Sequence, residues 1–141
     1  MLYRPLFAAL LGVTLFAAPL FASELESVPP IANAAAKKEC GACHMAFQPQ
    51  FLSAATWTTI FKDLSNHFGD NASLPDATRK DIEAYYVANA GRSQSGLLRI
   101  SQQSWYLRQH REVGQAKFAA VKSKANCNAC HKTADKGQYE N

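Results

Sequence analysis

The stretches Cys40-Gly-Ala-Cys43-His44 and Cys127-Asn-Ala-Cys130-His131 are two copies of the pattern C-x-x-C-H, and together they use all four cysteines of the chain. This pattern is typical of covalent haem c attachment, in which each thiol forms a thioether with a haem vinyl group and the adjacent histidine binds the iron. Two residues between the cysteines bring both sulfurs to one side of a helical turn. The sequence therefore predicts two covalently bound haem c groups, and two haems indicate electron transfer.

Three other kinds of site use paired cysteines. Structural zinc sites place roughly 15–20 residues between their C-x-x-C pairs, whereas here the intervening segment runs from His44 to Asn126. Disulfides are common in exported chains, and a thioredoxin-like C-x-x-C is a second redox option. Neither accounts for a histidine directly after both pairs, so haem attachment is the preferred interpretation.

The chain contains four histidines, and two of them, His67 and His110, lie outside the motifs. A lone extra histidine is more often an ordinary surface or core residue than a ligand. Two extra histidines for two irons favour a ligand role, because methionine offers no alternative. The initiating methionine lies in a predicted signal segment, and Met45 directly follows His44, so on a helix it points about 100° away. We therefore expect His44 and His131 as proximal ligands and bis-histidine coordination at both irons.

The N-terminal segment, residues 1–22, has the features of a secretory signal peptide. Arg4 supplies a positive start, an apolar run follows it, and Ala22 provides a small residue before a cut at Ser23. An uncleaved membrane anchor is the alternative, because the expected cut site departs from the A-x-A pattern. Since haem c is attached on the outer side of the bacterial inner membrane, the motifs and the signal both predict a periplasmic protein.

Charge is unevenly distributed along the predicted mature chain. Residues 23–90 carry 5 basic and 8 acidic side chains, whereas residues 91–141 carry 9 basic and 3 acidic ones. The basic half could steer an acidic redox partner, or it could simply compensate the charge of the haem propionates. Nucleic-acid binding is not expected of an exported haem protein, and any membrane association should come only through partners unless the signal stays uncleaved. The basic side chains in question are Arg108, Arg111, Lys117, Lys122, Lys124, Lys132 and Lys136.

The pattern of apolar residues predicts an all-α fold with long irregular connections, because no β-type alternation is sustained. A helix is expected over residues 33–44, leading into the first motif. A second is expected from a cap at Thr56 to an end near Gly69, with His67 at the edge of its apolar face. A third should open at residues 73–76, which resemble a capping box, and stop at Gly91.

Residues 91–96 are rich in glycine and serine, and they predict the boundary between two small lobes. The N-terminal haem c lobe is expected to span residues 23–91 and the C-terminal haem c lobe residues 97–141. In the second lobe, Tyr106 and His110 should share one face of a short helix. The chain is small for two haems, so we expect each haem to form the core of its own lobe and the haem-free protein to fold poorly.

Several strings in the chain are more specific than C-x-x-C-H alone: residues 40–52, Trp57, residues 64–74, Arg99-Ile100, Trp105 and residues 121–131. They resemble the periplasmic dihaem cytochrome c (DHC) family, and the resemblance covers essentially the whole mature chain. The resemblance implies an N-terminal lobe similar to a small class I cytochrome c and an irregular C-terminal lobe with short helices. It also implies that the first haem takes His44 and His67 and that the second takes His131 and His110. Crossed ligation, with His110 at the first haem, is the alternative, and loop-closure entropy disfavours it.

The expected function is that of a periplasmic, low-potential one-electron carrier and not of an enzyme. A bis-histidine iron has no open coordination position, and it lacks the methionine ligand that raises haem potential. The family resemblance implies redox partners such as a membrane b-type cytochrome and an oxygen-binding monohaem cytochrome. The alternative is a haem enzyme or gas sensor in which a distal histidine dissociates, and a third possibility is a purely structural haem domain.

Overall fold

A computed structural model describes residues 26–140 of the chain, so the predicted signal peptide at residues 1–22 lies outside the described residues. The described part is helical and contains no β-strand, which confirms the predicted all-α class. None of its helices has the length and apolar character needed to cross a membrane. The α-helices are α1 (Ala34–Cys40), α2 (Ala54–Lys62), α3 (Asp76–Ala88), α4 (Ser104–Gln109) and α5 (Gln115–Ala120), joined by loops and short 3-10 turns.

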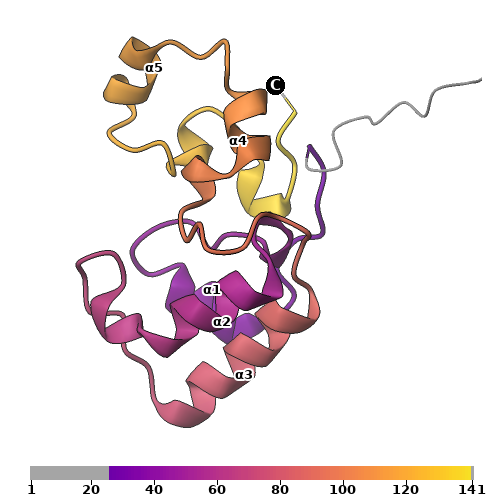
Figure 1. Ribbon diagram of the computed structural model, residues 1–141, viewed down its shortest axis with the longest axis vertical. Coiled ribbons are helices and arrows are strands. Elements are labelled where there is room, and N and C mark those ends of the chain that lie inside the picture. Colours follow the sequence, from indigo (N-terminus) through magenta and orange to yellow (C-terminus); the bar gives the residue numbers. More distant parts are fainter. Residues whose placement is uncertain (1–25, 141) are drawn as a thin grey trace, which may run out of the picture.

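The helices form two groups along the long axis of the molecule. Figure 1 shows α1, α2 and α3 together at one end, and α4, α5 and the C-terminal segment at the other. Helices α2 and α3 make the most extensive contact between any two elements. Their interface contains a cluster of aromatic rings, in which Tyr86 lies 4.5 Å from Trp57 and 5.5 Å from Phe61 between ring centroids. Ile82 is also completely buried. These side chains belong to one hydrophobic cluster that continues to Ile100 and Tyr106 in the second group.

The second helix is shorter than its sequence pattern predicts. Its N-cap is Ser53, whose hydroxyl accepts a hydrogen bond from the Thr56 amide, so the prediction of Thr56 as the cap was wrong. Serine is a favoured N-cap because its side chain can accept from the first free amides of a helix. The helix ends at Lys62, and His67 follows a separate 3-10 turn instead of lying near a helix end at Gly69.

The boundaries of the other predicted helices also differ in detail. Helix α1 ends at Cys40, and the remainder of the first motif is a turn. Helix α3 begins after Pro75, which makes no side-chain cap, so the capping-box interpretation was wrong. The same helix ends before Asn89, and Gly91 is not its stop. Gly91 is instead pressed against the backbone of Gln50, where an added Cβ would collide with the carbonyl oxygen.

The first described residues run along the C-terminal group of elements. Ser27 pairs with Gln138 in an isolated antiparallel β-bridge. Next to it, the Val28 amide donates to the Gly137 carbonyl over 2.9 Å, and the Tyr139 amide donates to the Glu26 carbonyl over 2.7 Å. Figure 1 shows this indigo segment beside the yellow C-terminal segment. These first residues, 26–31, which we call the leader, therefore tie the two ends of the described chain together.

Candidate haem sites

The first motif brings His44 close to one of the two extra histidines. The imidazole rings of His44 and His67 are nearly parallel, with an interplanar angle of 17° and centroids 6.2 Å apart. His44 is exposed, and its ring also stacks on Phe47 at 4.9 Å. Its Nδ1 lies 2.7 Å from the Met45 carbonyl oxygen. A hydrogen bond there fixes the proton on Nδ1 and leaves Nε2 free to bind a metal.

His67 is held by a tight two-residue turn. The His67 amide donates to the Asp70 carbonyl over 2.7 Å, and the Asp70 amide donates back over 3.2 Å. Between them Phe68 has φ 56° and Gly69 has φ 108°. Positive φ values at both central positions suit glycine and are unfavourable for phenylalanine. Burial and the neighbouring His44 lower the pKa of His67, which favours the neutral form that binds metals.

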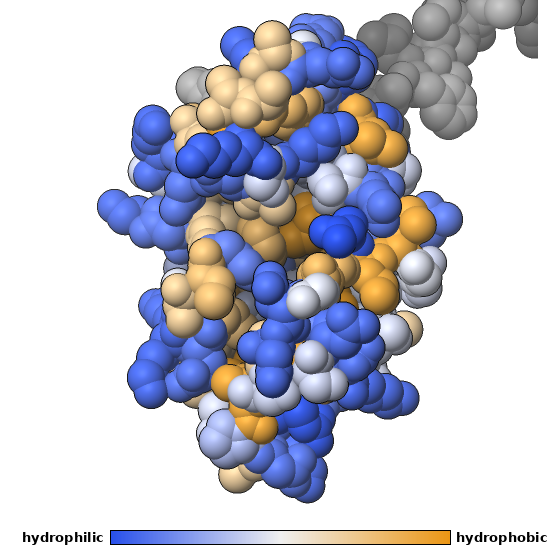
Figure 2. All heavy atoms as spheres, turned by 90° about the vertical axis from the view of Figure 1, so that its left-hand side faces the viewer, coloured by the Kyte–Doolittle hydropathy of each residue, from blue (hydrophilic) through white to orange (hydrophobic). Residues whose placement is uncertain are grey.

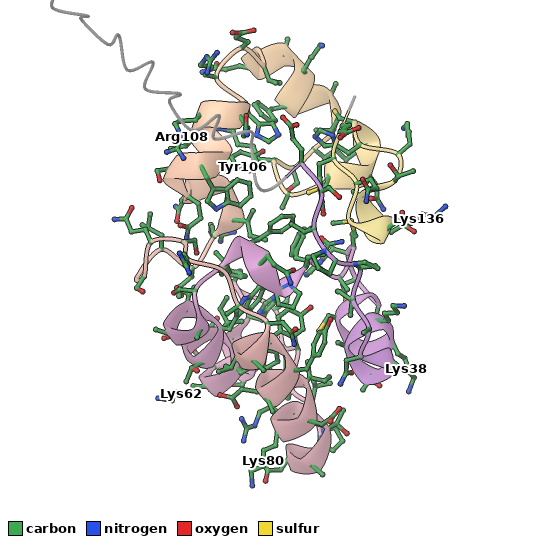
Figure 3. The ribbon with its side chains drawn as sticks, turned by 90° about the vertical axis from the view of Figure 1, so that its right-hand side faces the viewer. Lys38, Lys62, Lys80, Tyr106, Arg108 and Lys136 are labelled. Carbon is green, nitrogen blue, oxygen red and sulfur yellow. The ribbon has the colours of Figure 1, made fainter. Side chains whose placement is uncertain are left out.

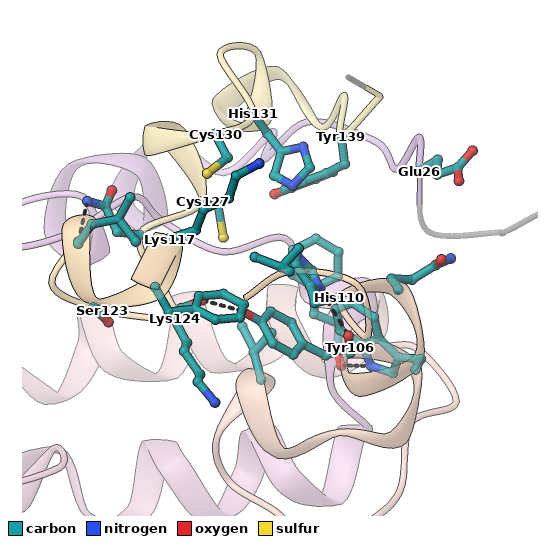
Figure 4. Close-up of a pocket in the computed structure, with 18 residues that line it drawn as sticks. Glu26, Tyr106, His110, Lys117, Ser123, Lys124, Cys127, Cys130, His131 and Tyr139 are labelled. Atoms are coloured by element: carbon teal, nitrogen blue, oxygen red, sulfur yellow. Dashed lines mark hydrogen bonds between the residues drawn. The ribbon is translucent and has the colours of Figure 1, made fainter. Parts of the chain in front are cut away.

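The second motif faces the other extra histidine across a pocket of about 470 Å³. His110 and His131 have ring centroids 6.1 Å apart, but their planes are nearly perpendicular, at 89°. Cys127 and Cys130 line the same pocket. Figure 4 shows both cysteines on the side of His131, with His110 opposite. Two sulfurs and two imidazoles from different segments therefore converge on one space.

The two rings of this second pair are held in different ways. His110 caps α4, stacks on Tyr106 at 4.0 Å, and has Nδ1 2.9 Å from the Tyr106 carbonyl oxygen. His131 has a buried Nδ1 without a hydrogen-bond partner. Burial lowers the pKa of His131, and the nearby His110 lowers it further. The backbone of Tyr139 opposes this shift, although it does not form a well-aligned hydrogen bond to Nδ1. The lowered pKa favours the neutral form of His131, which is the form that binds metals.

The spacing of both histidine pairs fits axial ligation of a haem iron. Imidazole–metal bonds of about 2 Å, plus about 1 Å from the ring nitrogen to the ring centre, place two axial rings about 6 Å apart. The observed separations are 6.2 Å for His44 and His67 and 6.1 Å for His110 and His131. The structure brings together the pairs implied by the family resemblance and not the crossed pair. Both sites therefore fit the predicted group.

The cysteines are placed differently within each motif. Cys40 and Cys127 are half-buried, whereas Cys43 and Cys130 are exposed. Burial raises the pKa of the Cys40 thiol and raises that of Cys127 to about 11. All four lie in the described part of the chain, and none is in a disulfide. No group of three or more His, Cys, Asp or Glu side chains within residues 26–140 is arranged to hold a bare metal ion.

Two residues at these sites were not singled out from the sequence. Gln48 is completely buried between the two groups of helices, and Tyr139 lies against His131. Neither belongs to a motif, and their contact joins positions 91 residues apart. The only local signal is that Tyr139 is an aromatic residue in an otherwise polar C-terminal segment.

Exposed cations and apolar residues are spread over the surface of the described chain. Figure 3 shows Lys38, Lys62, Lys80, Lys136 and Arg108 pointing away from the ribbon. Figure 2 shows apolar patches interrupting an otherwise hydrophilic face of the molecule. The large apolar side chains that are exposed in the described chain are Phe68, Val87 and Leu107.

Comparison with known proteins gives one consistent result. A profile of the dihaem cytochrome c family matches residues 36–139. Two solved structures of a dihaem cytochrome c (DHC) from Rhodobacter sphaeroides are similar to this chain. The first is 42% identical with a TM-score of 0.73, and the match covers 77% of this chain and 98% of that structure. The second is 40% identical with a TM-score of 0.73, and the match covers 79% of this chain and 99% of that structure. A dihaem cytochrome c from Shewanella baltica OS155 is 38% identical with a TM-score of 0.69, covering 77% of this chain and 87% of its own.

A comparison with curated proteins found no significant match. The family profile nevertheless spans both C-x-x-C-H motifs, and the similar structures are covered almost completely. The cofactors follow from the family, because its members carry two c-type haems bound covalently through their motifs. The chain therefore belongs to the dihaem cytochrome c family and is an electron-transfer cytochrome with two covalently bound haem c groups.

Proposed function

We propose that this cytochrome is a low-potential one-electron carrier in which both irons have two histidine ligands. Cys40 and Cys43 would hold the first haem, with His44 and His67 as its axial ligands. The second haem would be held by the cysteines of the second motif, with His131 and His110 as its ligands. The observation that carries this proposal is the pair of imidazole separations, 6.2 Å and 6.1 Å, at the two sites.

This ligand set favours electron transfer over catalysis. Because a histidine pair would occupy both remaining positions on each iron, no position would be free for a substrate, and the bound haem would supply one-electron chemistry. Methionine ligation raises haem potential, and its replacement by histidine supports a low value. The hydrogen bonds from Nδ1 of His44 and His110 to backbone carbonyls also strengthen both imidazoles as donors. A strong donor stabilises the ferric state, which again lowers the potential.

We propose the periplasm as the location, on the basis of the signal-like residues 1–22 and of the C-x-x-C-H motifs. The partner would be a redox protein with an acidic surface, and a membrane b-type cytochrome and an oxygen-binding monohaem cytochrome are the two kinds we favour. The charge pattern supports an acidic partner, because five lysines of the second half are exposed and form no ion pair with any described residue. They are Lys117, Lys122, Lys124, Lys132 and Lys136.

The test is an optical spectrum of the reduced protein with and without carbon monoxide, combined with a potentiometric titration. A bis-histidine carrier should show two low-potential one-electron steps and little change on exposure to the gas. Rapid carbon monoxide binding by the wild-type protein, or a high potential at either haem, would contradict the proposal. Haem content measured by mass spectrometry provides the control that both groups are present.

One observation favours a second candidate, in which the first haem binds a gas. The turn that carries His67 places Phe68 at φ 56°, a conformation that costs a non-glycine residue on the order of 1–3 kcal/mol. Release of the ligand would relieve that strain. In that case carbon monoxide should bind only at the first haem, while the spectrum of the second stays unchanged.

A further inference from the structure

One buried side chain connects the two haem sites. Gln48 is 0% exposed, and its amide nitrogen donates to the Ala134 carbonyl over 2.7 Å. Its side-chain oxygen accepts a hydrogen bond from the Tyr139 hydroxyl. A buried amide that uses both of its ends fixes its partners firmly, because breaking either bond leaves a buried polar group unpaired. Gln48 thus holds two points of the C-terminal segment in place.

Both of those points lie next to the second histidine pair. The Ala134 amide donates to the carbonyl of His131 over 3.1 Å. The ring of Tyr139 meets the ring of His131 edge-on, with centroids 5.5 Å apart and planes at 63°. Figure 4 shows Tyr139 alongside His131 at the edge of the pocket. On its other side, Tyr139 packs against Phe51 at 5.2 Å, so the tyrosine ring has little freedom to move.

His131 lacks the side-chain hydrogen bond that orients two of the other histidines. Metal-binding histidines are usually oriented by a hydrogen bond from their second ring nitrogen. His44 and His110 have that bond, to the carbonyls of Met45 and Tyr106. The Nδ1 of His131 is buried and has no partner. The rotation of the His131 ring therefore depends on its contacts with Tyr139, whose ring and backbone both lie beside it.

We propose that Tyr139, anchored by Gln48 from the opposite half of the molecule, is a positioning residue that fixes the ring plane of His131 perpendicular to that of His110. The inference rests on the proposed ligation of the second iron by these two histidines. The observed angle between their planes is 89°, whereas the first pair is nearly parallel at 17°. The two irons are then electronically different although their ligands are the same.

The difference has a physical cause in the iron d orbitals. An axial imidazole interacts through its π system with the d orbital that lies perpendicular to its plane. Two parallel rings act on the same orbital and separate its energy from that of its neighbour. Two perpendicular rings act on both orbitals equally, so the orbitals stay close in energy and the ferric iron becomes strongly anisotropic. Electron paramagnetic resonance separates these cases, because perpendicular ligands give a larger maximum g value than parallel ones.

The experiment is electron paramagnetic resonance of the ferric, fully haem-loaded protein. The wild type should give two low-spin signals, one rhombic from the first haem and one with a large maximum g value from the second. Tyr139→Leu removes the ring that holds His131 and should shift the second signal toward a smaller maximum g value. Gln48→Leu should shift it in the same direction, and the first signal should stay in place in both variants.

Two further variants separate positioning from general destabilisation. Tyr139→Phe keeps the ring that packs on His131 but loses the hydrogen bond to Gln48. It should therefore shift the second signal in the same direction as Tyr139→Leu, by a smaller amount. Gln138→Ala removes a glutamine hydrogen bond from the same segment, to Ser27 over 3.0 Å, and should leave both signals unchanged. Haem content and the thermal midpoint of each variant show whether it has folded.

The possible failures are distinguishable. A second haem that is high-spin in the wild type would overturn the proposed ligation itself. Two low-spin signals with an unchanged second signal in Tyr139→Leu would overturn the positioning role and leave the ligation intact. Two rhombic signals in the wild type would also refute the positioning role, because the rings would then not be perpendicular.

Discussion

The hydrogen bond from the Tyr86 hydroxyl to the Phe47 carbonyl offers a sharp test of how α3 supports the first haem site. Phe47 belongs to the loop that follows the first motif, and its ring stacks on His44. The bond is 2.9 Å long and the Tyr86 side chain is 2% exposed. Tyr86→Phe keeps the ring in its contacts with Trp57 and Phe61 and removes only the hydroxyl. The carbonyl loses a part-buried partner, so the free energy of unfolding should fall by about 1–2 kcal/mol.

The assay is thermal unfolding of the oxidised, haem-loaded protein followed by circular dichroism. A loss of 1 kcal/mol corresponds to roughly 3–6 °C for a domain of this size, so we expect the midpoint to fall by about 5 °C. Tyr85→Phe is the matched control, because the Tyr85 hydroxyl accepts from the Ala32 amide in an exposed setting where water can replace it. Equal effects of the two substitutions, or no effect of Tyr86→Phe, would refute the reasoning that this bond anchors the ligand loop.

Three other predictions concern ligation, docking and attachment. His67→Ala should make only the first haem high-spin or open to external ligands, and His110→Ala only the second, as followed by magnetic resonance signals assigned to each haem. Replacing Lys122 and Lys124 with Glu should slow association with an acidic redox partner and weaken the salt dependence of the association rate. The reason is that exposed charges are screened within about 8 Å at physiological ionic strength. Stopped-flow kinetics across a salt series measures the association rate. Cys127→Ala should leave one thioether at the second haem and sharply lower the yield of haem-loaded protein, as read from the intact mass.

Each of these predictions has a result that would count against it. If His67→Ala altered the second haem, ligation would be crossed between the two halves. Association rates independent of salt would remove the role of the lysines in steering and point to an apolar contact. A purified mature protein whose intact mass lacks the added mass of two haems would contradict covalent haem attachment.

The parts of this protein that the sequence predicted well are those with a local chemical signature. The two motifs are contiguous and predict two haems, which family membership confirms. The two extra histidines stand out because the chain has so few, and their role as ligands stays a prediction. The short helix that brings Tyr106 beneath His110 also follows from a spacing of four residues, and the rings stack at 4.0 Å. The all-α class followed in the same way from the absence of β-type alternation.

What the sequence did not predict depends on contacts between distant segments. The apolar pattern continues through Leu64 and Phe68, but the helix ends at Lys62. A 3-10 turn follows it, and then the tight turn at Phe68 and Gly69. Phe68, which continues the apolar pattern in the sequence, is 42% exposed in the structure. Gly91 was taken as a helix stop, whereas its real constraint is the backbone of Gln50, some forty positions earlier. Such constraints leave no local trace in the chain.

The bridge between Ser27 and Gln138 has a consequence for the order in which this protein matures. These positions are 111 residues apart, so the leader has no partner until the last segment has been made and folded around the second haem. Contacts of such long range form late, because a large loop must close before they are gained. Resistance of residues 26–31 to limited proteolysis would therefore distinguish a finished molecule from one that has acquired only its first haem, and it would do so without any spectroscopic label.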